Sequence, residues 1–171
     1  MTTASLPVSY LELTTVPVGP PPAPPAGQGH AITAERLGVA DYLALYRAVG
    51  APLRWDSRLK LAPALLAALL ESGRLAIFVL RDAGRIALGF CEFDRERFPE
   101  VELTHFGLVP EAQGRGLGPW LLGTALAAVW RTGPRRIWLH TDPWDHPAAL
   151  GVYARAGFVR YLVREEPVED L

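Results

Sequence analysis

The spacing of apolar residues divides the chain into segments with helical periodicity and short apolar or β-branched runs. Helices are expected over 40–50, 57–73, 116–133 and 146–157. Strands are expected over 8–14, 101–109, 135–141 and 158–166, with a hairpin over 74–94 that turns at 82–84. The order is therefore strand, two helices, three strands, helix, strand, helix, strand. Antiparallel neighbours followed by a strand–helix–strand crossover predict an α/β fold with a mixed sheet.

The helical periodicity also predicts which residues face the core. In the first helix these are Tyr42, Leu45, Tyr46 and Val49, with Gly50 as the stop signal. In the third they are Leu117, Leu121, Leu122, Ala125, Leu126 and Val129. We expect Pro63 in or near the first turn of the second helix, since proline is tolerated there.

Between the first strand and the first helix lies a stretch without apolar periodicity. Residues 16–29 contain six prolines, and such a segment favours an extended connector. A proline-rich segment can alternatively bind the aromatic groove of a partner. A length of 171 residues fits one domain, 1–171.

Composition narrows the class of protein without naming a reaction. The net charge of −1 gives no indication of nucleic-acid or membrane binding. Neither a signal peptide nor a membrane-spanning run is evident, and the single Cys91, in a predicted strand, fits a buried thiol in a reducing compartment. Sixteen of the seventeen basic residues are Arg, with Lys60 as the exception, which suggests a GC-rich, bacterial gene. We expect a cytoplasmic protein.

The segment "QGRGLG" (113–118) follows a predicted strand and opens a predicted helix. Glycines let the unpaired amides at a helix N-terminus approach an anion, and Arg115 adds a fixed charge, so a diphosphate is a suitable ligand. A turn without ligand is the alternative. A Walker A site is excluded because no Lys-Ser or Lys-Thr follows the last glycine. A Rossmann site is excluded because the glycine spacing differs and the segment does not lie at the start of the fold.

What remains is the pattern Q-x-x-G-x-G, formed by Gln113, Gly116 and Gly118 with Gly114 and Arg115 between them. This pattern resembles motif A of the GNAT superfamily of acetyl-CoA-dependent N-acetyltransferases.

A second segment, "HPAALGVYARAGF" (146–158), resembles a later helix of the same family, Asn-x-x-Ala-x-x-x-Tyr-x-x-x-Gly-Phe. Ala149, Tyr153, Gly157 and Phe158 match it, and His146 stands where Asn is usual. The resemblance is specific over about 101–160 and concerns only element order over 30–100.

The resemblance implies a GNAT fold, with a six- to seven-stranded sheet flanked by about four helices, and acetyl-CoA as cosubstrate. Gln113, Gly114, Arg115, Gly116, Leu117 and Gly118 would surround the pyrophosphate of coenzyme A. Main-chain groups of Leu108 and Val109 would hold the pantetheine arm, and His146, Ala149 and Tyr153 would also contact the cofactor. Pro119 departs from the family because it supplies no amide, so we expect an intact helix with one donor fewer.

Acetyl transfer to an amine requires a base, because an alkyl ammonium is almost fully charged at neutral pH. Glu102 lies eleven residues before Gln113, the spacing at which histone-type family members carry their glutamate base. His105 is the rival candidate. Strand alternation puts the two on opposite faces unless a bulge intervenes. Glu102 could otherwise pair with an Arg, and His105 could be a hydrogen-bonded core residue.

By the same resemblance, Tyr153 is the acid that protonates the departing thiolate, the alternative being a packing role on a buried helix face. We expect no covalent intermediate, because Cys91 is predicted to be buried. The transfer would then be direct.

The loop "LHTDPWDHP" (139–147) groups acidic, histidine and aromatic residues, but its spacing fits no zinc site, so we expect no metal. Asp145 or His146 is expected as a helix N-cap. The loop, together with Trp55 and Asp56, is a candidate lining of the acceptor site. The acceptor would be a small-molecule or peptide amine, and a homodimer is possible. The alternatives to an enzyme are an acyl-CoA sensor and an interaction domain using the proline-rich segment.

Overall fold

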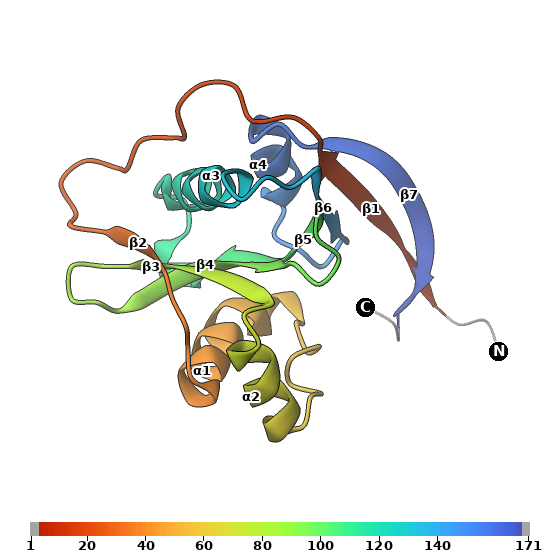
Figure 1. Ribbon diagram of the computed structural model, residues 1–171, viewed down its shortest axis with the longest axis horizontal. Helices are drawn as coiled ribbons and strands as arrows, with labels where there is room; N and C mark the ends of the chain where they lie inside the picture. The colour runs from red at the N-terminus through yellow and green to blue at the C-terminus, as the bar shows by residue number, and fades with distance from the viewer. Residues whose placement is uncertain (1–3, 169–171) are drawn as a thin grey trace.

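A seven-stranded sheet crosses the molecule, and helices cover both of its faces (Figure 1). A computed structural model describes residues 4–168. The strands are β1 (Ser5–Leu13), β2 (Ala31–Ala34), β3 (Leu75–Arg81), β4 (Ala87–Asp94), β5 (Glu100–Leu108), β6 (Arg136–Thr141) and β7 (Val159–Pro167). The α-helices are α1 (Val39–Gly50), α2 (Pro63–Glu71), α3 (Leu117–Trp130) and α4 (Ala149–Arg155). Two 3₁₀ turns, η1 (Ala51–Leu53) and η2 (Pro110–Ala112), follow α1 and β5.

The strand order β2-β3-β4-β5-β6-β1-β7 confirms the predicted mixed α/β fold. Strands β2 to β5 are antiparallel neighbours, and the β5–α3–β6 crossover gives the parallel pair of the sheet, β5 with β6. Helices α1 and α2 lie on one face and α3 and α4 on the other (Figure 1).

The structure differs from the prediction at the start of the second helix and in having a strand β2. The second helix begins at Pro63 instead of residue 57, because the residue before a proline avoids the helical region, and Ala62 has ψ 142°. Strand β2 was not expected, since its four residues at the sheet edge give too short a pattern.

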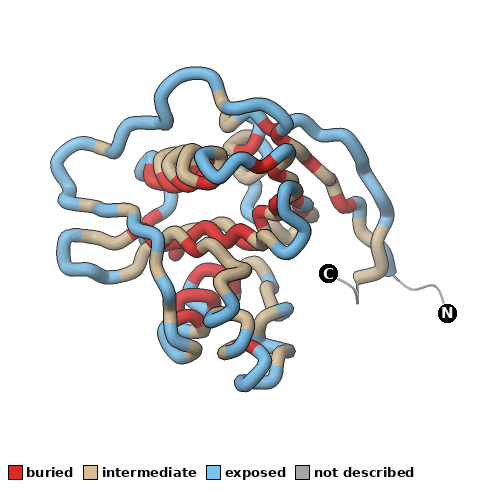
Figure 2. The backbone as a smooth tube through the Cα atoms, in the orientation of Figure 1, coloured by how far each residue is buried: buried red, intermediate tan, exposed pale blue. Residues whose placement is uncertain are grey.

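The core lies on both faces of the sheet (Figure 2). The buried faces predicted for α1 and α3 are confirmed residue by residue. Cys91 is fully buried, as expected. Among the described residues, no helix combines the length and apolarity that crossing a bilayer requires.

Helix α1 ends at Gly50, as predicted, although the glycine does not adopt a left-handed conformation there. Its φ is −90°, an ordinary helical value, and the chain continues directly into η1. A Cβ at Gly50 would lie 2.5 Å from the indole ring of Trp55. Gly50 therefore makes room for Trp55 to pack against α1.

Strand β1 lies between β6 and β7 and is antiparallel to both. The chain must then cross from this side of the sheet to β2 at the opposite edge. Residues 14–30, which we call the strap, make this crossing without helix or strand and pass over α3 (Figure 1).

Candidate active site

The parallel strands β5 and β6 separate partway along their length. Their pairing runs from Glu100 opposite Arg136 to Glu102 opposite Trp138. Beyond Glu102, β5 continues to Leu108 while remaining paired only with β4. The main chain of β5 that faces β6 is thus left open over this stretch, next to the glycine-rich turn.

The glycine-rich turn requires its glycines. Gly114 and Gly116 have φ of 71° and 74°, a left-handed conformation that other residues rarely adopt. Gly116 immediately precedes the first residue of α3 and directs the amides of the first helical turn outward. Pro119 is the third residue of α3, and the helix is intact, as predicted. The turn therefore presents the positive end of a 14-residue helix, with the Pro119 amide missing.

A cavity of about 380 Å³, the glycine-turn cavity, lies between this turn and α4. Of the cofactor-contact candidates, it is lined by Leu108, Gln113, Gly114, Gly116, Gly118, His146, Ala149 and Tyr153.

Three further candidates are not in its lining. Leu117 is fully buried in the core. The Val109 N–H donates to the Leu88 carbonyl at 2.8 Å, and its own carbonyl accepts from the Ala112 N–H at 3.0 Å. The exposed Arg115 donates to the side-chain oxygen of Gln28 in the strap. The main-chain carbonyl of Leu108 is also engaged, because it accepts a hydrogen bond from Gln113 Nε2 at 3.2 Å.

A second cavity of about 270 Å³, the β5 cavity, lies on the α1 side of the gap. It is lined by Tyr46, Leu53, Arg54, Trp55, Asp56, Ser57, Arg58, Glu102, Leu103, Thr104, His105, Phe106, His140, Asp142, Trp144, Asp145 and Tyr153. Four residues line both cavities: Leu53, Phe106, Asp145 and Tyr153. The two cavities therefore meet beside Tyr153.

A β-bulge decides how β5 faces this cavity. His105 pairs with Glu92 and Leu103 with Phe93, so Thr104 is an extra residue in β5. Thr104 and His105 both contact the Glu92 carboxylate, and are therefore on one face of the sheet. The bulge resets the alternation, so Glu102 shares that face with His105, and both line the β5 cavity. The sequence predicts Glu102 and His105 on opposite faces of the strand unless a bulge intervenes, and the structure contains such a bulge.

Among the described residues, Glu102 forms no hydrogen bond through its carboxylate and no ion pair with a Lys or Arg. The nearest cationic candidate, His140 Nε2, is 3.8 Å from Glu102 Oε1. Burial raises the pKa of Glu102 above its ordinary value of 4.5; His140 opposes this shift, and Asp94 adds to it. The Glu102 carboxylate has a raised pKa and lines a cavity, and both properties suit it to accept a proton.

Glu92 on β4 was not singled out in the sequence, although it is a fully buried carboxylate beside the same site. It accepts hydrogen bonds from Arg58 Nη2 at 2.5 Å, Thr104 Oγ1 at 2.7 Å and the Tyr42 hydroxyl. His105 Nδ1 lies 3.0 Å from Glu92 Oε1. Burial alone would raise the pKa of Glu92, but His105, Arg58 and Tyr42 together hold it well below its usual range. We call these five residues the Glu92 network.

Tyr153 is buried on α4, with its ring 5.9 Å from that of Phe106. Burial, and secondarily the charge of Asp145, raise the pKa of its hydroxyl far above the ordinary value. The hydroxyl therefore keeps its proton at any physiological pH. Burial likewise raises the pKa of Cys91, which is enclosed in the core and lines neither cavity.

The loop after β6 contributes Asp142, Trp144 and Asp145 to the β5 cavity, and His140 contributes from β6 itself. Trp55 and Asp56 contribute from the opposite side. The Arg54 guanidinium lies 4.9 Å from the ring centre of Trp144 and joins the two sides.

The N-cap predictions for this loop are wrong, because α4 begins at Ala149 with Ala148 as its N-cap. Asp145 instead accepts from Thr141 Oγ1 at 2.5 Å. His146 Nδ1 accepts from the Ala148 N–H at 3.1 Å.

Comparisons with known proteins agree with this geometry. The family model described as "Acetyltransferase (GNAT) family" matches residues 42–158. A mycothiol acetyltransferase of Geodermatophilus obscurus is 40% identical over 62 residues, which are 36% of this chain and 20% of that protein.

Two solved structures resemble the chain in fold. A GCN5-related N-acetyltransferase from Sphaerobacter thermophilus superimposes with a TM-score of 0.64 and 22% identity, over 96% of this chain and 53% of the other. A tandem GNAT protein from the clavulanic acid biosynthesis pathway superimposes with a TM-score of 0.66 and 19% identity, over 94% of this chain and 52% of the other. The chain thus spans about half the length of these structures and a fifth of the curated relative.

Proposed function

This chain belongs to the acetyltransferase (GNAT) family, and from that membership we propose that it transfers acetyl from acetyl-CoA directly to a primary amine of a small-molecule or peptide acceptor. The observation that carries the proposal is the meeting of two cavities at Tyr153. The glycine-turn cavity suits a diphosphate and its attached arm. The β5 cavity, which contains four carboxylic side chains (Asp56, Glu102, Asp142 and Asp145), suits a cationic amine.

In the proposed reaction, acetyl-CoA supplies the thioester whose carbonyl carbon the amine attacks. Glu102 takes one proton from the ammonium form of the acceptor before the attack, so the nucleophile is the neutral amine, and the nitrogen releases a second proton to solvent as the C–N bond forms. Tyr153 donates its hydroxyl proton to the sulfur as the C–S bond breaks, and the proton held by Glu102 then returns through solvent to Tyr153. The raised pKa of Glu102 and the retained proton of Tyr153 both support these roles. With Cys91 in the core, direct transfer needs no enzyme nucleophile.

The test has two stages on the purified protein. Acetyl-CoA at saturating concentration is expected to raise the melting temperature, since a ligand that binds only the folded state stabilises it. Thiol release is then measured against a panel of primary amines, with each amine omitted in turn as the blank. No thermal shift would contradict coenzyme binding, whereas a shift without amine-dependent thiol release across the panel would favour the acyl-CoA sensor.

Pro119 gives a prediction for coenzyme affinity. Replacing Pro119 with alanine restores the third amide of α3 at the proposed pyrophosphate site. One additional hydrogen bond to a charged group contributes about 1.5 kcal/mol, so the Kd for coenzyme A is expected to fall about tenfold. Isothermal titration measures the change, and Pro134→Ala, in the turn after α3, serves as the matched control. Equal affinities in wild type and Pro119→Ala would show that this amide position does not meet the ligand.

We also propose that the protein is cytoplasmic, because the buried, unpaired Cys91 fits a reducing compartment.

We further propose that the protein forms a homodimer. Strand β7 is an edge strand on which Val159, Tyr161 and Val163 are exposed, as Figure 2 shows for the strand as a whole. Light scattering of the protein in solution measures its mass, and a monomeric mass at micromolar concentration would refute the dimer.

A further inference from the structure

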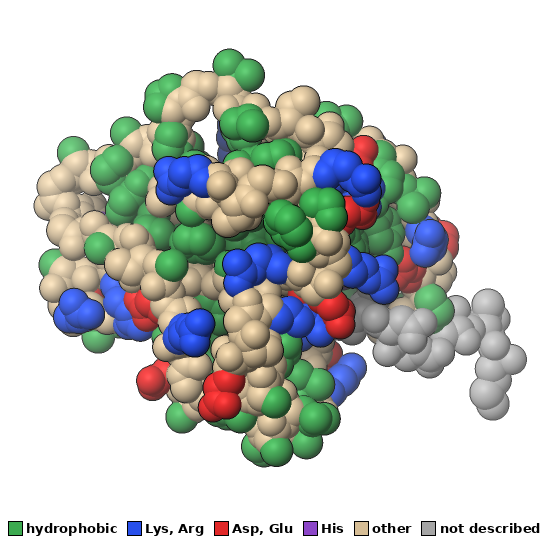
Figure 3. All heavy atoms as spheres, viewed as in Figure 1, with side chains coloured by type: hydrophobic (Ala, Val, Ile, Leu, Met, Phe, Trp, Pro, Cys, Tyr) green, Lys and Arg blue, Asp and Glu red, His purple; other side chains and the backbone are tan. Residues whose placement is uncertain are grey.

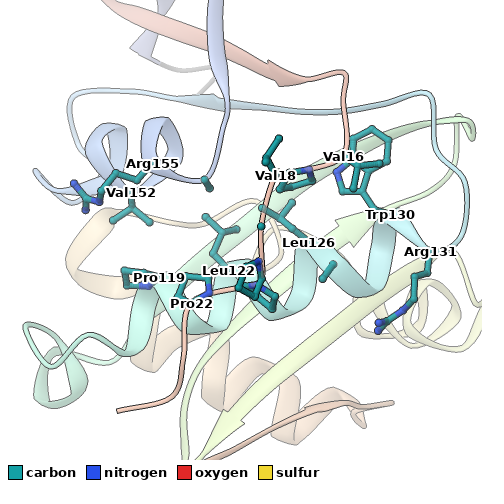
Figure 4. A pocket seen from close by; sticks show the side chains of 17 residues that line it. Val16, Val18, Pro22, Pro119, Leu122, Leu126, Trp130, Arg131, Val152 and Arg155 are labelled. Carbon is teal, nitrogen blue, oxygen red and sulfur yellow. The ribbon is translucent and has the colours of Figure 1, made fainter. Parts of the chain in front are cut away.

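Charge is distributed unevenly among the cavities. A cavity of about 530 Å³ lies between the strap and the helices α3 and α4 (Figure 4). Its charged lining residues are Arg131 and Arg155, and no carboxylic side chain of the described residues lines it. The β5 cavity, in contrast, has Glu102 in its wall. The cationic end of an amine acceptor therefore finds a counter-charge in the β5 cavity and none in the larger one.

The surface charge of the protein does not by itself select one kind of amine. The net charge is −1, and Figure 3 shows basic and acidic side chains interspersed over one face of the molecule. Long-range attraction thus discriminates little between amines that carry a second positive or a second negative group. Discrimination has to come from charged groups that the acceptor meets directly in the β5 cavity.

Two guanidinium groups line the β5 cavity, and one of them is already paired. Arg58 forms an ion pair with the buried Glu92 at 2.5 Å. The side chain of Arg54 has neither an ion pair nor a hydrogen bond within residues 4–168, so its N–H donors are available to a ligand. The guanidinium carbon of Arg54 lies over the ring of Trp144, 4.9 Å from its centre. This contact holds the cation in place without satisfying its hydrogen-bond donors.

Most of the carboxylic side chains in this cavity are engaged by the protein. The partners are Lys60 for Asp56 at 2.9 Å, the Trp144 N–H for Asp142 at 2.7 Å and Thr141 Oγ1 for Asp145 at 2.5 Å. The carboxylate of Glu102 has only His140 Nε2 nearby, at 3.8 Å. The cavity therefore offers an acceptor one weakly engaged carboxylate, Glu102, and one unpaired guanidinium, Arg54.

The backbone at Arg54 is left-handed, with φ 61° and ψ 26°, a conformation that glycine or asparagine adopts more readily than arginine. Such conformations are frequent at binding sites, where the surrounding structure maintains them. Arg85, in the turn between β3 and β4, has a similar φ of 67° and lines neither the glycine-turn nor the β5 cavity. The strain alone therefore indicates no site. At Arg54 it coincides with an unpaired cation in a cavity wall.

We propose that Arg54 binds a carboxylate of the acceptor, so that the acceptor is an amino acid whose amine lies at Glu102 and whose carboxylate lies at Arg54. This inference rests on the proposed function, because it takes Glu102 to receive the amine. The planar fork of a guanidinium matches a carboxylate, whereas a second ammonium group would be repelled by it. A cavity of about 270 Å³ is slightly smaller than those that hold drug-sized ligands, which suits a molecule of amino-acid size.

The experiment compares L-amino acids with their carboxamides as acceptors in the thiol-release assay. Arg54→Gly removes the guanidinium at a position whose φ suits glycine. The ratio of kcat/KM for acid to that for amide is expected to fall about ten- to hundredfold, chiefly through KM for the acid, because a charge-assisted contact is lost. Comparing this ratio between variants cancels the difference in amine basicity between acid and amide. Arg85→Gly, the same replacement outside the cavity, is the matched control and should keep the wild-type ratio.

The outcomes separate this inference from the function on which it rests. A wild-type acid-to-amide ratio in Arg54→Gly would overturn the carboxylate subsite, and so would a wild-type protein that acetylates other amines but no amino acid. Arg54→Asn, whose side chain also tolerates a left-handed backbone, is expected to show the same fall and decides the question if Arg54→Gly folds poorly. Absence of both acetyl-CoA binding and thiol release with any amine would instead overturn the proposed function.

Discussion

Replacing Glu102 with glutamine is expected to lower kcat for acetyl transfer by about 10²- to 10⁴-fold, the usual contribution of a general base. The amide keeps the size of the side chain and its place in the β5 cavity but cannot take a proton from the amine. Because no Lys or Arg is paired with Glu102 in the described residues, the substitution leaves no buried cation uncompensated. Binding of acetyl-CoA and the melting temperature should therefore change little.

The pH profile identifies the group. The raised pKa of Glu102 means that its carboxyl is protonated, and inactive as a base, at pH values where an ordinary glutamate is already ionised. Wild-type kcat should thus fall as the pH falls through this raised pKa. In Glu102→Gln that inflection should be absent, and only the ionisation of the free amine should remain.

Glu100→Gln is the matched control for this prediction. Glu100 lies on the same strand, but its carboxylate pairs with Arg135 at 2.7 Å and lines neither the glycine-turn nor the β5 cavity. Unchanged kcat and an unchanged pH profile in Glu102→Gln would reject Glu102 as the base. If the inflection survives there and disappears in His105→Gln, the base is His105.

The predictability of this site differs between its helices and its strands. The buried faces of α1 and α3 could be predicted because a 3.6-residue period is a local property of the sequence. The turn at Gly114 and Gly116 could be predicted for a similar reason, since its φ values restrict which residue can stand there.

The faces of β5 could not be assigned from alternation. One extra residue, Thr104, moves Glu102 onto the face of His105, and a bulge depends on the pairing with β4. The insertion of β1 between β6 and β7 is similarly non-local, because it joins segments more than 120 residues apart. The strap follows from that topology, so its passage over α3 could not be inferred from its prolines alone.

Glu92 illustrates a signal that the sequence contains and that motif spacing does not use. Glu102 was selected by its distance from Gln113, whereas Glu92 is an acidic residue in the otherwise apolar segment "ALGFCEF". What the sequence lacks is the partner, because Arg58 lies 34 residues earlier in a turn that was expected to be helical. Only the folded chain shows that Glu92 is enclosed by donors on every side.

Glu92→Ala is accordingly expected to cost about 3–5 kcal/mol of unfolding free energy. It leaves the Arg58 guanidinium, whose side chain is 14% exposed, without its counter-charge, and it removes the acceptor of the Tyr42 hydroxyl. Urea denaturation of wild type and variant measures the difference. Glu35→Ala, which breaks the more exposed pair of Glu35 with Arg81, is the control, with an expected cost of about 1 kcal/mol or less.

The stabilising effect of Glu92 should also depend on pH in a defined direction. Because the folded protein holds the pKa of Glu92 below its unfolded value near 4.5, the contribution is complete above about pH 4.5 and is lost as the pH falls further. Wild type and Glu92→Gln should therefore differ most in stability at neutral pH and converge in acid. Glu35→Ala, with a weaker pair, should show a smaller convergence.

A double variant distinguishes an uncompensated charge from a simple loss of packing. If Glu92→Ala is costly because Arg58 is left charged and buried, then Arg58→Met combined with Glu92→Ala should recover much of the loss, since no unpaired ion remains. If the two losses simply add, the ion pair is not what Glu92 contributes. Should Glu92→Ala fail to fold, the cycle is completed with Glu92→Gln alone, because the amide still accepts from Tyr42 and retains the shape of the side chain.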